Sequence, residues 1–94
     1  MSIPELASVR IVVTGRVQGV FFRRSAAEQA RALELKGWAR NLSDGSVEIV
    51  GEGKRPNLER LLAWAHHGPP LARVETVRVQ WGAYEGKFTG FEVR

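Results

Sequence analysis

Three observations on the sequence predict an α+β fold with two helices on one face of an antiparallel sheet. Strand-like runs rich in β-branched residues alternate with two amphipathic helical segments in the order β-α-β-β-α-β. The pair Asp44-Gly45 between two strand-like runs predicts a hairpin. A short strand-like run follows at the end of the chain. This order is the split βαβ, or ferredoxin-like, arrangement.

The first strand is predicted at residues 9–13, which are dense in β-branched residues. It leads into a loop over residues 15–19, in which Gly15 and Gly19 can adopt backbone angles that other residues avoid. The first helix is predicted at residues 23–35, which are rich in helix formers. One apolar stripe of that helix would face the sheet and comprises Phe22, Ala26, Ala30 and Leu33.

The second half of the chain also contains a helical segment between strand-like runs. Gly37 is expected where the chain turns back after the first helix. The second helix is predicted to begin at Pro56 and to end at the Gly68-Pro69-Pro70 stop signal, with Leu58, Leu61, Leu62 and Ala65 on one face. The remaining strands are predicted at residues 38–42, 47–50, 74–81 and 88–93.

Length and composition limit the organisation of the chain. The 94 residues are expected to form a single domain, 1–94, in which residues 1–7 are a flexible N-terminal tail. The absence of cysteine excludes disulfides and thiol catalysis. The longest apolar run, 61–65, is far shorter than a membrane span, and the N-terminus lacks the pattern of a secretion signal. We therefore expect a soluble, cytoplasmic protein, and nothing in the sequence demands more than a monomer.

The charge balance points to an anionic partner. The chain has 14 Lys and Arg against 10 Asp and Glu, and eleven of the basic residues are arginines. Arginine suits phosphate because its planar guanidinium offers two parallel donors. The basic residues are scattered rather than clustered, so the total charge is compatible with a nucleic-acid binder and with a small phosphate site.

The most informative segment is residues 15–23, which join a strand to a helix through a glycine-bearing loop. Backbone N–H groups in such a loop can converge on an anion, and the helix N-terminus adds partial positive charge. Arg23 stands at the start of the helix and could bind two oxygens of a phosphate. No Gly-Lys-Ser/Thr follows, so the segment is not a nucleotide P-loop. On composition alone, a plain tight turn with a surface arginine remains the alternative.

Residues 15–23 resemble the first signature of the acylphosphatase family, position for position. Residues 37–41, followed by Asp44, Gly45 and Val47, resemble the second signature. The resemblance continues through residues 68–74 and the closing 90–93, and so covers roughly residues 9–94.

The resemblance implies hydrolysis of the carboxyl-phosphate bond of small acyl phosphates, without a metal or another cofactor. Inorganic phosphate or sulfate is then expected as product or inhibitor, and neither a nucleic acid nor a membrane as partner. Two catalytic residues carry over, Arg23 and Asn41. The phosphate-binding residues that carry over are Arg16, Val17, Gln18, Gly19, Val20, Phe21 and Phe22. Ala39 departs from the larger aliphatic residue usual in the family, which we expect to affect only packing. Arg24 is expected outside the site, because adjacent helix positions point about 100° apart.

Elementary chemistry agrees with that implication. A carboxylate leaving group has a conjugate acid with a pKa of about 4, so it can depart without a general acid. The remaining tasks are to bind the phosphoryl group and to aim a water in line with the breaking bond. Loop amides and Arg23 suit the first task, and the Asn41 amide, which both donates and accepts, suits the second. A phosphate oxygen of the substrate is the hypothetical acceptor of the water's proton.

Other candidate sites have simpler explanations. His66 and His67 are adjacent, so their rings diverge and cannot chelate one metal, and the ten carboxylates are too scattered for a metal cluster. We therefore expect no metal site. Trp38, Trp64 and Trp81 are expected in or at the rim of the core.

An RNA-binding module of the same fold is the first alternative function. The nearest candidate segment, 87–93, lacks a glycine after Lys87 and has Glu92 where such modules carry an apolar residue. A second alternative is a catalytically weak family member, or one like the acylphosphatase-like domain of larger carbamoyl-transferring maturation proteins.

Overall fold

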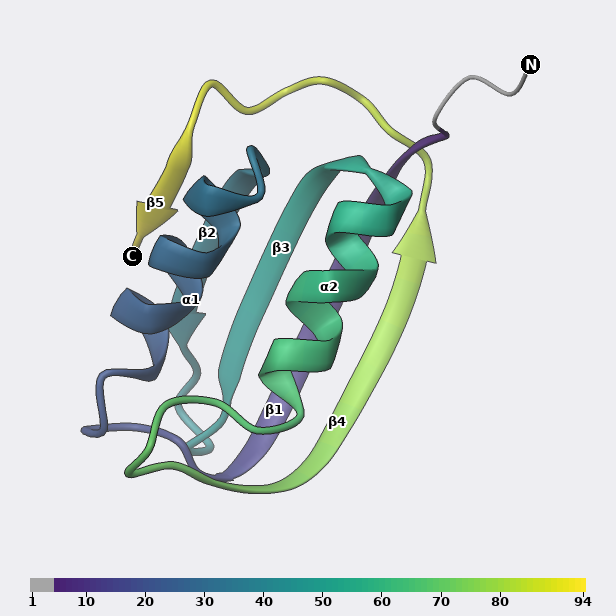
Figure 1. The fold of residues 1–94 in the computed structure, drawn as a ribbon. Helices are drawn as coiled ribbons and strands as arrows, with labels where there is room; N and C mark the ends of the chain where they lie inside the picture. The colour runs from purple at the N-terminus through teal and green to yellow at the C-terminus, as the bar shows by residue number, and fades with distance from the viewer. Residues whose placement is uncertain (1–4) are drawn as a thin grey trace.

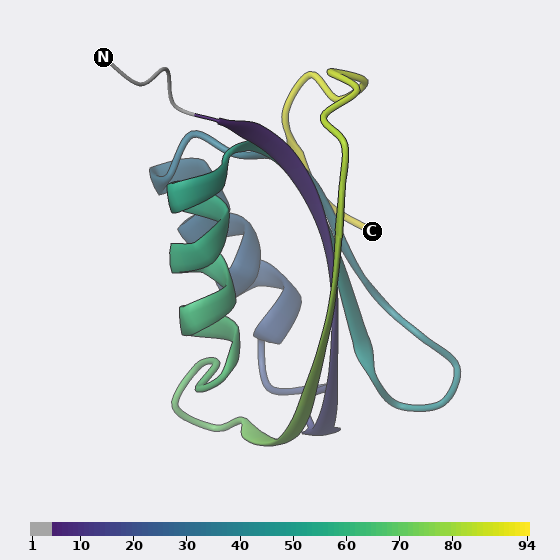
Figure 2. The same cartoon turned by 90° about the vertical axis from the view of Figure 1, so that its right-hand side faces the viewer.

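The computed structural model describes residues 5–94, which form five strands and two helices (Figure 1). Their bounds are β1 Leu6–Arg16, α1 Phe22–Ala32, β2 Lys36–Asn41, β3 Val47–Lys54, α2 Arg55–Ala65, β4 Arg73–Gly82 and β5 Phe91–Val93. Both helices cover the same face of the sheet and leave the other face open (Figure 2). The predicted ferredoxin-like α+β fold is confirmed.

The strand order in the sheet is β4-β1-β3-β2-β5. The first four strands pair antiparallel, as predicted, but β5 pairs parallel to β2. Residues 83–90 cause this departure, because they carry the chain across one end of the sheet to its opposite edge (Figure 1). The chain therefore enters β5 from the end at which β2 also begins, and the sheet is mixed.

The core lies between the sheet and the two helices. The predicted helix stripes are largely confirmed, since only Leu33 and Leu62 are partly rather than fully buried. The fully buried helical residues are Phe22, Ala26, Ala27 and Ala30 of α1 and Leu58, Leu61 and Ala65 of α2. They meet residues such as Ile11 and Ile49, which are completely buried on the two central strands. The small alanines allow α1 to approach the sheet closely, which fixes its N-terminus beside the ends of β1 and β2.

Gly37 has a different role from the one predicted. It lies inside β2, and the chain reverses at Glu34, whose φ is 57°. At Gly37, φ is 147°, and a Cβ would overlap the carbonyl oxygen of Val50 on β3. This glycine is therefore required by the close approach of two strands and not by a turn.

The expected tail at residues 1–7 can be compared with the structure only from residue 5, because residues 1–4 lie outside the described residues. Leu6 and Ala7 belong to β1, and Ala7 is buried. The strand therefore begins earlier than residue 9, where the sequence predicted it. In the part of the chain that the structure describes, neither helix is long and apolar enough to cross a membrane.

Candidate active site

The loop between β1 and α1 has a backbone suited to an anion. Gly19 and Phe21 have positive φ angles of 74° and 65°, and the intervening Val20 does not. Backbone that alternates in this way turns successive N–H groups toward one side and forms a concave nest for an anion. Gly19 adopts this conformation without strain, whereas at Phe21 it is uncommon for a non-glycine residue.

Three side chains of this segment are buried and anchor it to the core. Val17, Val20 and Phe22 are 1%, 5% and 1% exposed, respectively. The Phe22 ring also packs against the Trp64 ring of α2, with 5.2 Å between the ring centroids. Because these side chains face the protein interior, only their main-chain groups are available to a ligand.

The N-terminus of α1 offers further unpaired donors. The first hydrogen bond of the helix runs from the Ser25 N–H to the Phe21 carbonyl, at 3.0 Å. The N–H groups of Phe22, Arg23 and Arg24 therefore have no partner inside the helix. No side chain caps this end, and its first turn has no acidic residue. The partial positive charge of the helix end is left to attract an external anion.

Arg23 extends from this first turn toward the end of β5. Its guanidinium donates to the main-chain oxygen of Arg94, at 2.5 Å. The Arg94 N–H in turn donates to the Ala39 carbonyl at 2.8 Å, which fixes the accepting residue beside β2. One of the five guanidinium N–H donors is used in this way, and the others remain available to a ligand.

Asn41 is the last residue of β2, opposite Val47 of β3, and its side chain is exposed. The β1–α1 loop, residues 17–21, is tied directly to the turn that follows Asn41. Gln18 donates from Nε2 to the carbonyl of Leu42 at 2.8 Å and to that of Ser46 at 2.9 Å. This side-chain amide nitrogen is therefore used to bridge the loop and the hairpin, and Gln18 can offer its main-chain N–H to an anion.

A pocket of about 260 Å³ opens where these elements meet. It is lined by Val17, Gly19, Phe21, Phe22, Arg23, Arg24, Asn41 and Val93. Both residues that the sequence predicted as catalytic, Arg23 and Asn41, belong to this wall although they come from different elements. Of the predicted phosphate-binding residues, Arg16, Gln18 and Val20 are not part of the wall.

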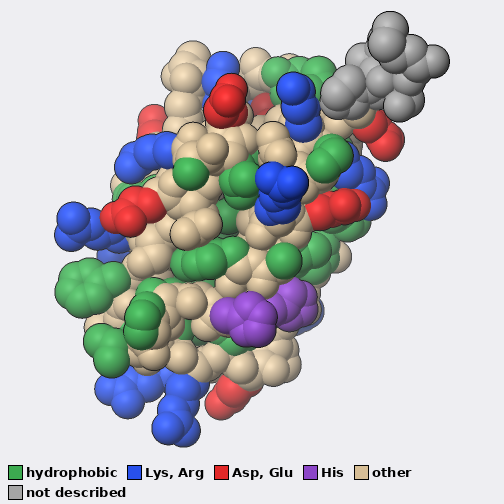
Figure 3. Space-filling view, viewed as in Figure 1, with side chains coloured by type: hydrophobic (Ala, Val, Ile, Leu, Met, Phe, Trp, Pro, Cys, Tyr) green, Lys and Arg blue, Asp and Glu red, His purple; other side chains and the backbone are tan. Residues whose placement is uncertain are grey.

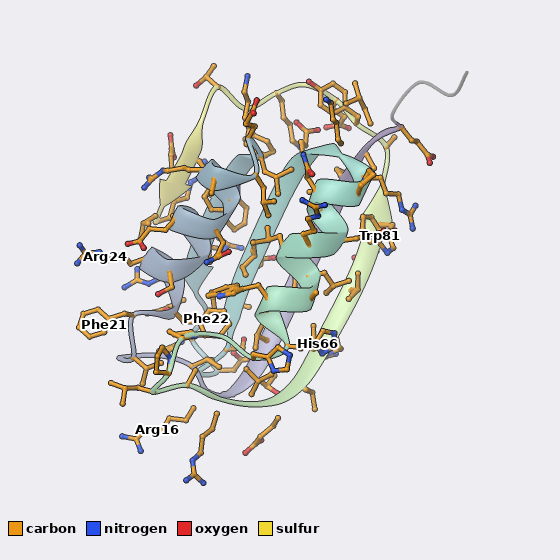
Figure 4. All side chains as sticks on the ribbon, viewed as in Figure 1. Arg16, Phe21, Phe22, Arg24, His66 and Trp81 are labelled. Atoms are coloured by element: carbon orange, nitrogen blue, oxygen red, sulfur yellow. The ribbon has the colours of Figure 1, made fainter. Side chains whose placement is uncertain are left out.

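The position of Arg24 corrects the expectation from the sequence. This residue was expected outside the site, but it lines the pocket. Figure 4 shows Phe21 and Arg24 at the same edge of the molecule, beside the start of α1. A rotation of about 100° in the first turn of a helix does not remove a long side chain from a pocket that opens at the helix end. In the sequence, the signal that Arg24 could reach the pocket was its place as a second arginine in the first turn of the helix.

Two carboxylates near the hairpin stay ionised for different reasons. Hydrogen bonds from the Ser46 hydroxyl and N–H hold the pKa of Asp44 below its ordinary value. Glu48 lies on the open face of the sheet, where burial opposes ionisation. Hydrogen bonds from Arg40 and Arg10 outweigh that burial and hold the pKa of Glu48 below its ordinary value. Neither group is a candidate general acid near neutral pH.

No group of three or more His, Asp or Glu residues within 5–94 could hold a metal ion. His66 and His67 follow the end of α2, and both are exposed. Figure 3 shows the two histidines side by side on the surface.

A family model for acylphosphatases matches residues 9–93 of the chain. The chain belongs to the acylphosphatase family. The resemblance inferred from residues 15–23 and 37–41 is therefore confirmed.

Individual acylphosphatases agree with this assignment in sequence and in structure. One from Anaeromyxobacter sp. strain Fw109-5 is 51% identical over 90 residues, which cover 96% of this chain and 97% of that protein. The acylphosphatase structure from Coxiella burnetii has a TM-score of 0.89 at 40% identity and covers 95% of this chain and 93% of that one. The crystal structure of the acylphosphatase from Bacillus subtilis has a TM-score of 0.90 at 33% identity, covering 96% and 99%. Identity and fold together support a hydrolase with acylphosphatase activity.

Proposed function

We propose that this member of the acylphosphatase family hydrolyses small acyl phosphates to a carboxylate and inorganic phosphate, with the phosphoryl group bound in the pocket between β1, α1 and β2. The observation that carries the proposal is the composition of one pocket wall. An anion-binding loop, the open N-terminus of α1, Arg23 and Asn41 all meet there. The proposed reaction needs one copy of the chain, as a single domain in the cytoplasm, and no cofactor.

The phosphoryl group is bound by main-chain and side-chain donors together. N–H groups of residues 16–22 would surround its oxygens, and the Arg23 guanidinium would bind from the side of β5. Charge on the three equatorial oxygens must be stabilised during phosphoryl transfer, and donors fixed by the fold do so without reorganising. The buried anchors Val17, Val20 and Phe22 keep the loop in this arrangement.

The attacking water is oriented by Asn41. Its side chain reaches the pocket from the end of β2, separate from the loop and from α1. A carboxamide accepts a hydrogen bond through its oxygen and donates through its nitrogen, so it can fix both the position and the direction of a water. The water oxygen attacks phosphorus as the bond from phosphorus to the acyl oxygen breaks, and a phosphate oxygen takes the proton.

The nature of the leaving group explains why so few catalytic groups are needed. The electron pair of the breaking bond departs on a carboxylate, whose conjugate acid has a pKa of about 4. Such a group is stable as an anion at neutral pH and needs no proton from the enzyme. A phosphate monoester, which releases a much more basic alkoxide or phenoxide, is expected to react poorly in this pocket.

Phosphate release from acetyl phosphate and benzoyl phosphate, with EDTA present, tests the proposal against p-nitrophenyl phosphate as the ester control. We expect rapid hydrolysis of both acyl phosphates, little of the ester, and competitive inhibition by inorganic phosphate or sulfate. Loss of activity in EDTA would contradict the metal-free mechanism, and equal rates for ester and anhydride would contradict the role of the leaving group.

Asn41→Ala tests the water-orienting role separately from binding. The variant is expected to lose about a hundredfold in kcat, because one positioned hydrogen-bonding group is removed. Inhibition by inorganic phosphate should be nearly unchanged, since the loop amides and Arg23 remain. A variant with undiminished kcat would exclude Asn41 from the mechanism.

A further inference from the structure

Arg24 lies in the pocket wall but has no task in the proposed reaction. Its side chain is 76% exposed, and its partner in an ion pair is Glu28, which is 63% exposed, with 3.5 Å between Nε and Oε1. An exposed pair of this kind contributes little to stability. The guanidinium can therefore exchange Glu28 for an anion that enters the pocket.

The two adjacent arginines of α1 reach the pocket in different directions. Arg23 is directed toward the end of β5, where it contacts the main-chain oxygen of Arg94. Arg24 is directed along α1 toward Glu28, one turn farther into the helix. Adjacent helix positions differ by about 100° in direction. We therefore do not expect the two guanidinium groups to bind the same phosphoryl group together.

The pocket has room for more than a phosphoryl group. Its volume is about 260 Å³, whereas one water needs roughly 10–15 Å³ on a comparable measure. Of the lining residues in the described part of the chain, two are arginines and none is acidic. With the phosphoryl group on the loop amides and Arg23, the acyl part of the substrate extends toward the rim, which Arg24 and Phe21 form.

We propose that Arg24 is a specificity-determining residue that favours acyl phosphates whose acyl part carries a second anionic group, either a carboxylate or a phosphate. The inference rests on the proposed function, because the acyl part reaches the rim only when the phosphoryl group occupies the loop. Phe21, whose side chain is 65% exposed, offers apolar surface to the carbon chain between the two anionic groups. Arginine suits this position because its planar fork matches both carboxylate and phosphate oxygens.

The test compares kcat/KM for succinyl phosphate, which has a distal carboxylate, with kcat/KM for acetyl phosphate, which has none. The ratio of the two values is expected to fall by up to about fivefold in Arg24→Gln, the upper end of the effect of an exposed charge pair. The matched control is Arg60→Gln on α2, which also removes an exposed positive charge and should leave the ratio unchanged. Arg24→Lys keeps the charge and should retain part of the preference for succinyl phosphate. Glu28→Gln removes the carboxylate that pairs with Arg24 and should raise the ratio.

An acyl phosphate with a distal phosphate, 3-phosphoglyceroyl phosphate, forms the second arm. A larger effect of Arg24→Gln on this compound than on succinyl phosphate identifies phosphate as the preferred second group, and the reverse result identifies carboxylate. The effect should shrink as salt is added, because the contact is exposed.

Three outcomes would overturn the inference. If the wild-type chain hydrolyses acetyl phosphate and Arg24→Gln leaves both ratios unchanged, Arg24 does not determine specificity, while the proposed function stands. If Arg60→Gln lowers the ratio equally, the preference comes from total charge. If the wild-type chain hydrolyses no acyl phosphate, the proposed function fails, and the inference fails with it.

Discussion

The two helices of this protein begin under similar conditions and each begins beside a pocket, but the pocket proposed to bind the phosphoryl group lies at the start of α1. Both α1 and α2 have 11 residues, and neither has a capping side chain or an acidic residue in its first turn. Five residues separate β1 from α1, whereas α2 follows β3 without an intervening residue. Pro56 in the first turn of α2 has no N–H, and the Arg55 N–H donates to the Glu5 carbonyl at 2.8 Å.

The arginines in the first turns of the two helices also differ in the groups that they contact. The Arg55 guanidinium lies over the Trp81 ring, 4.0 Å from its centroid, and bonds Glu59 at 3.3 Å. Arg23 contacts the main-chain oxygen of Arg94 beside the pocket, and no Asp or Glu side chain within residues 5–94 forms an ion pair with it. Partial positive charge at a helix end is common to both helices. The connecting loop and the local partners decide whether that charge is available to a ligand.

The largest expected difference between the N-termini of α1 and α2 is the loss of activity when the arginine in the first turn is replaced. Arg23→Ala should lower kcat/KM for acetyl phosphate about a thousandfold and weaken inhibition by inorganic phosphate, because a donor to the transition state is lost. Arg55→Ala should lose about 1 kcal/mol of unfolding free energy, from the contact with Trp81, and keep kcat/KM within about twofold. Steady-state phosphate release and urea denaturation measure the two effects. Comparable activity losses would break the distinction between the helix ends.

The second prediction concerns the backbone of the β1–α1 loop, which is proposed to bind the phosphoryl group. Gly19 and Gly45 have φ angles of 74° and 93°, and a Cβ at either would meet nothing within 4 Å. Alanine at each should therefore cost similar stability, about 1 kcal/mol of left-handed backbone strain. Gly19→Ala should also lower kcat/KM about tenfold, because it displaces loop amides from the phosphoryl oxygens. Gly45 lies in the β2–β3 turn and outside the pocket wall, so Gly45→Ala should retain wild-type kcat/KM.

The third prediction uses one amide side chain near each helix start. Gln18 bridges the β1–α1 loop to the β2–β3 turn, and Asn57 in α2 donates to the Leu33 carbonyl at 3.2 Å. Replacement of either by alanine should cost about 1 kcal/mol of unfolding free energy. Gln18→Ala should also reduce kcat about fivefold, since the loop and the Asn41 strand end lose their direct link. An equal loss of kcat in Asn57→Ala would show that the Gln18 bridge has no specific role in catalysis.

The smallest effect is expected on the sheet that supports both helices. The pKa of Glu48 is lower in the folded chain than its ordinary value of 4.5. Its ionised form therefore stabilises the fold fully above about pH 4.5, and this contribution is lost as the pH falls through the lower folded pKa. The difference in unfolding free energy between wild type and Glu48→Gln should shrink as the pH falls through the lower folded pKa. A difference that does not change with pH would contradict the stabilising role of ionised Glu48.

Local patterns were sufficient for most of the fold. The β-branched residues at 9–13, the apolar stripe beginning at Phe22 and the Asp44-Gly45 turn are each patterns of residues close together in the chain. The family signatures also identified Arg23 and Asn41, which the structure brings to one pocket wall. The parallel pairing of β5 and the strand-to-strand contact of Gly37 were not predicted, because each depends on where a distant segment returns to the sheet.

The sequence by itself therefore determined the order of elements and the glycine-bearing loop, and its resemblance to the family indicated the two residues proposed as catalytic. Only the tertiary structure decided that Arg24 lines the pocket, that Gln18 bonds the hairpin and that Arg23 meets Arg94. The physical reason is separation along the chain. The bonds of Gln18 and Arg23 join residues 24 to 71 positions apart, and such contacts form only when the packed sheet and helices bring those segments together.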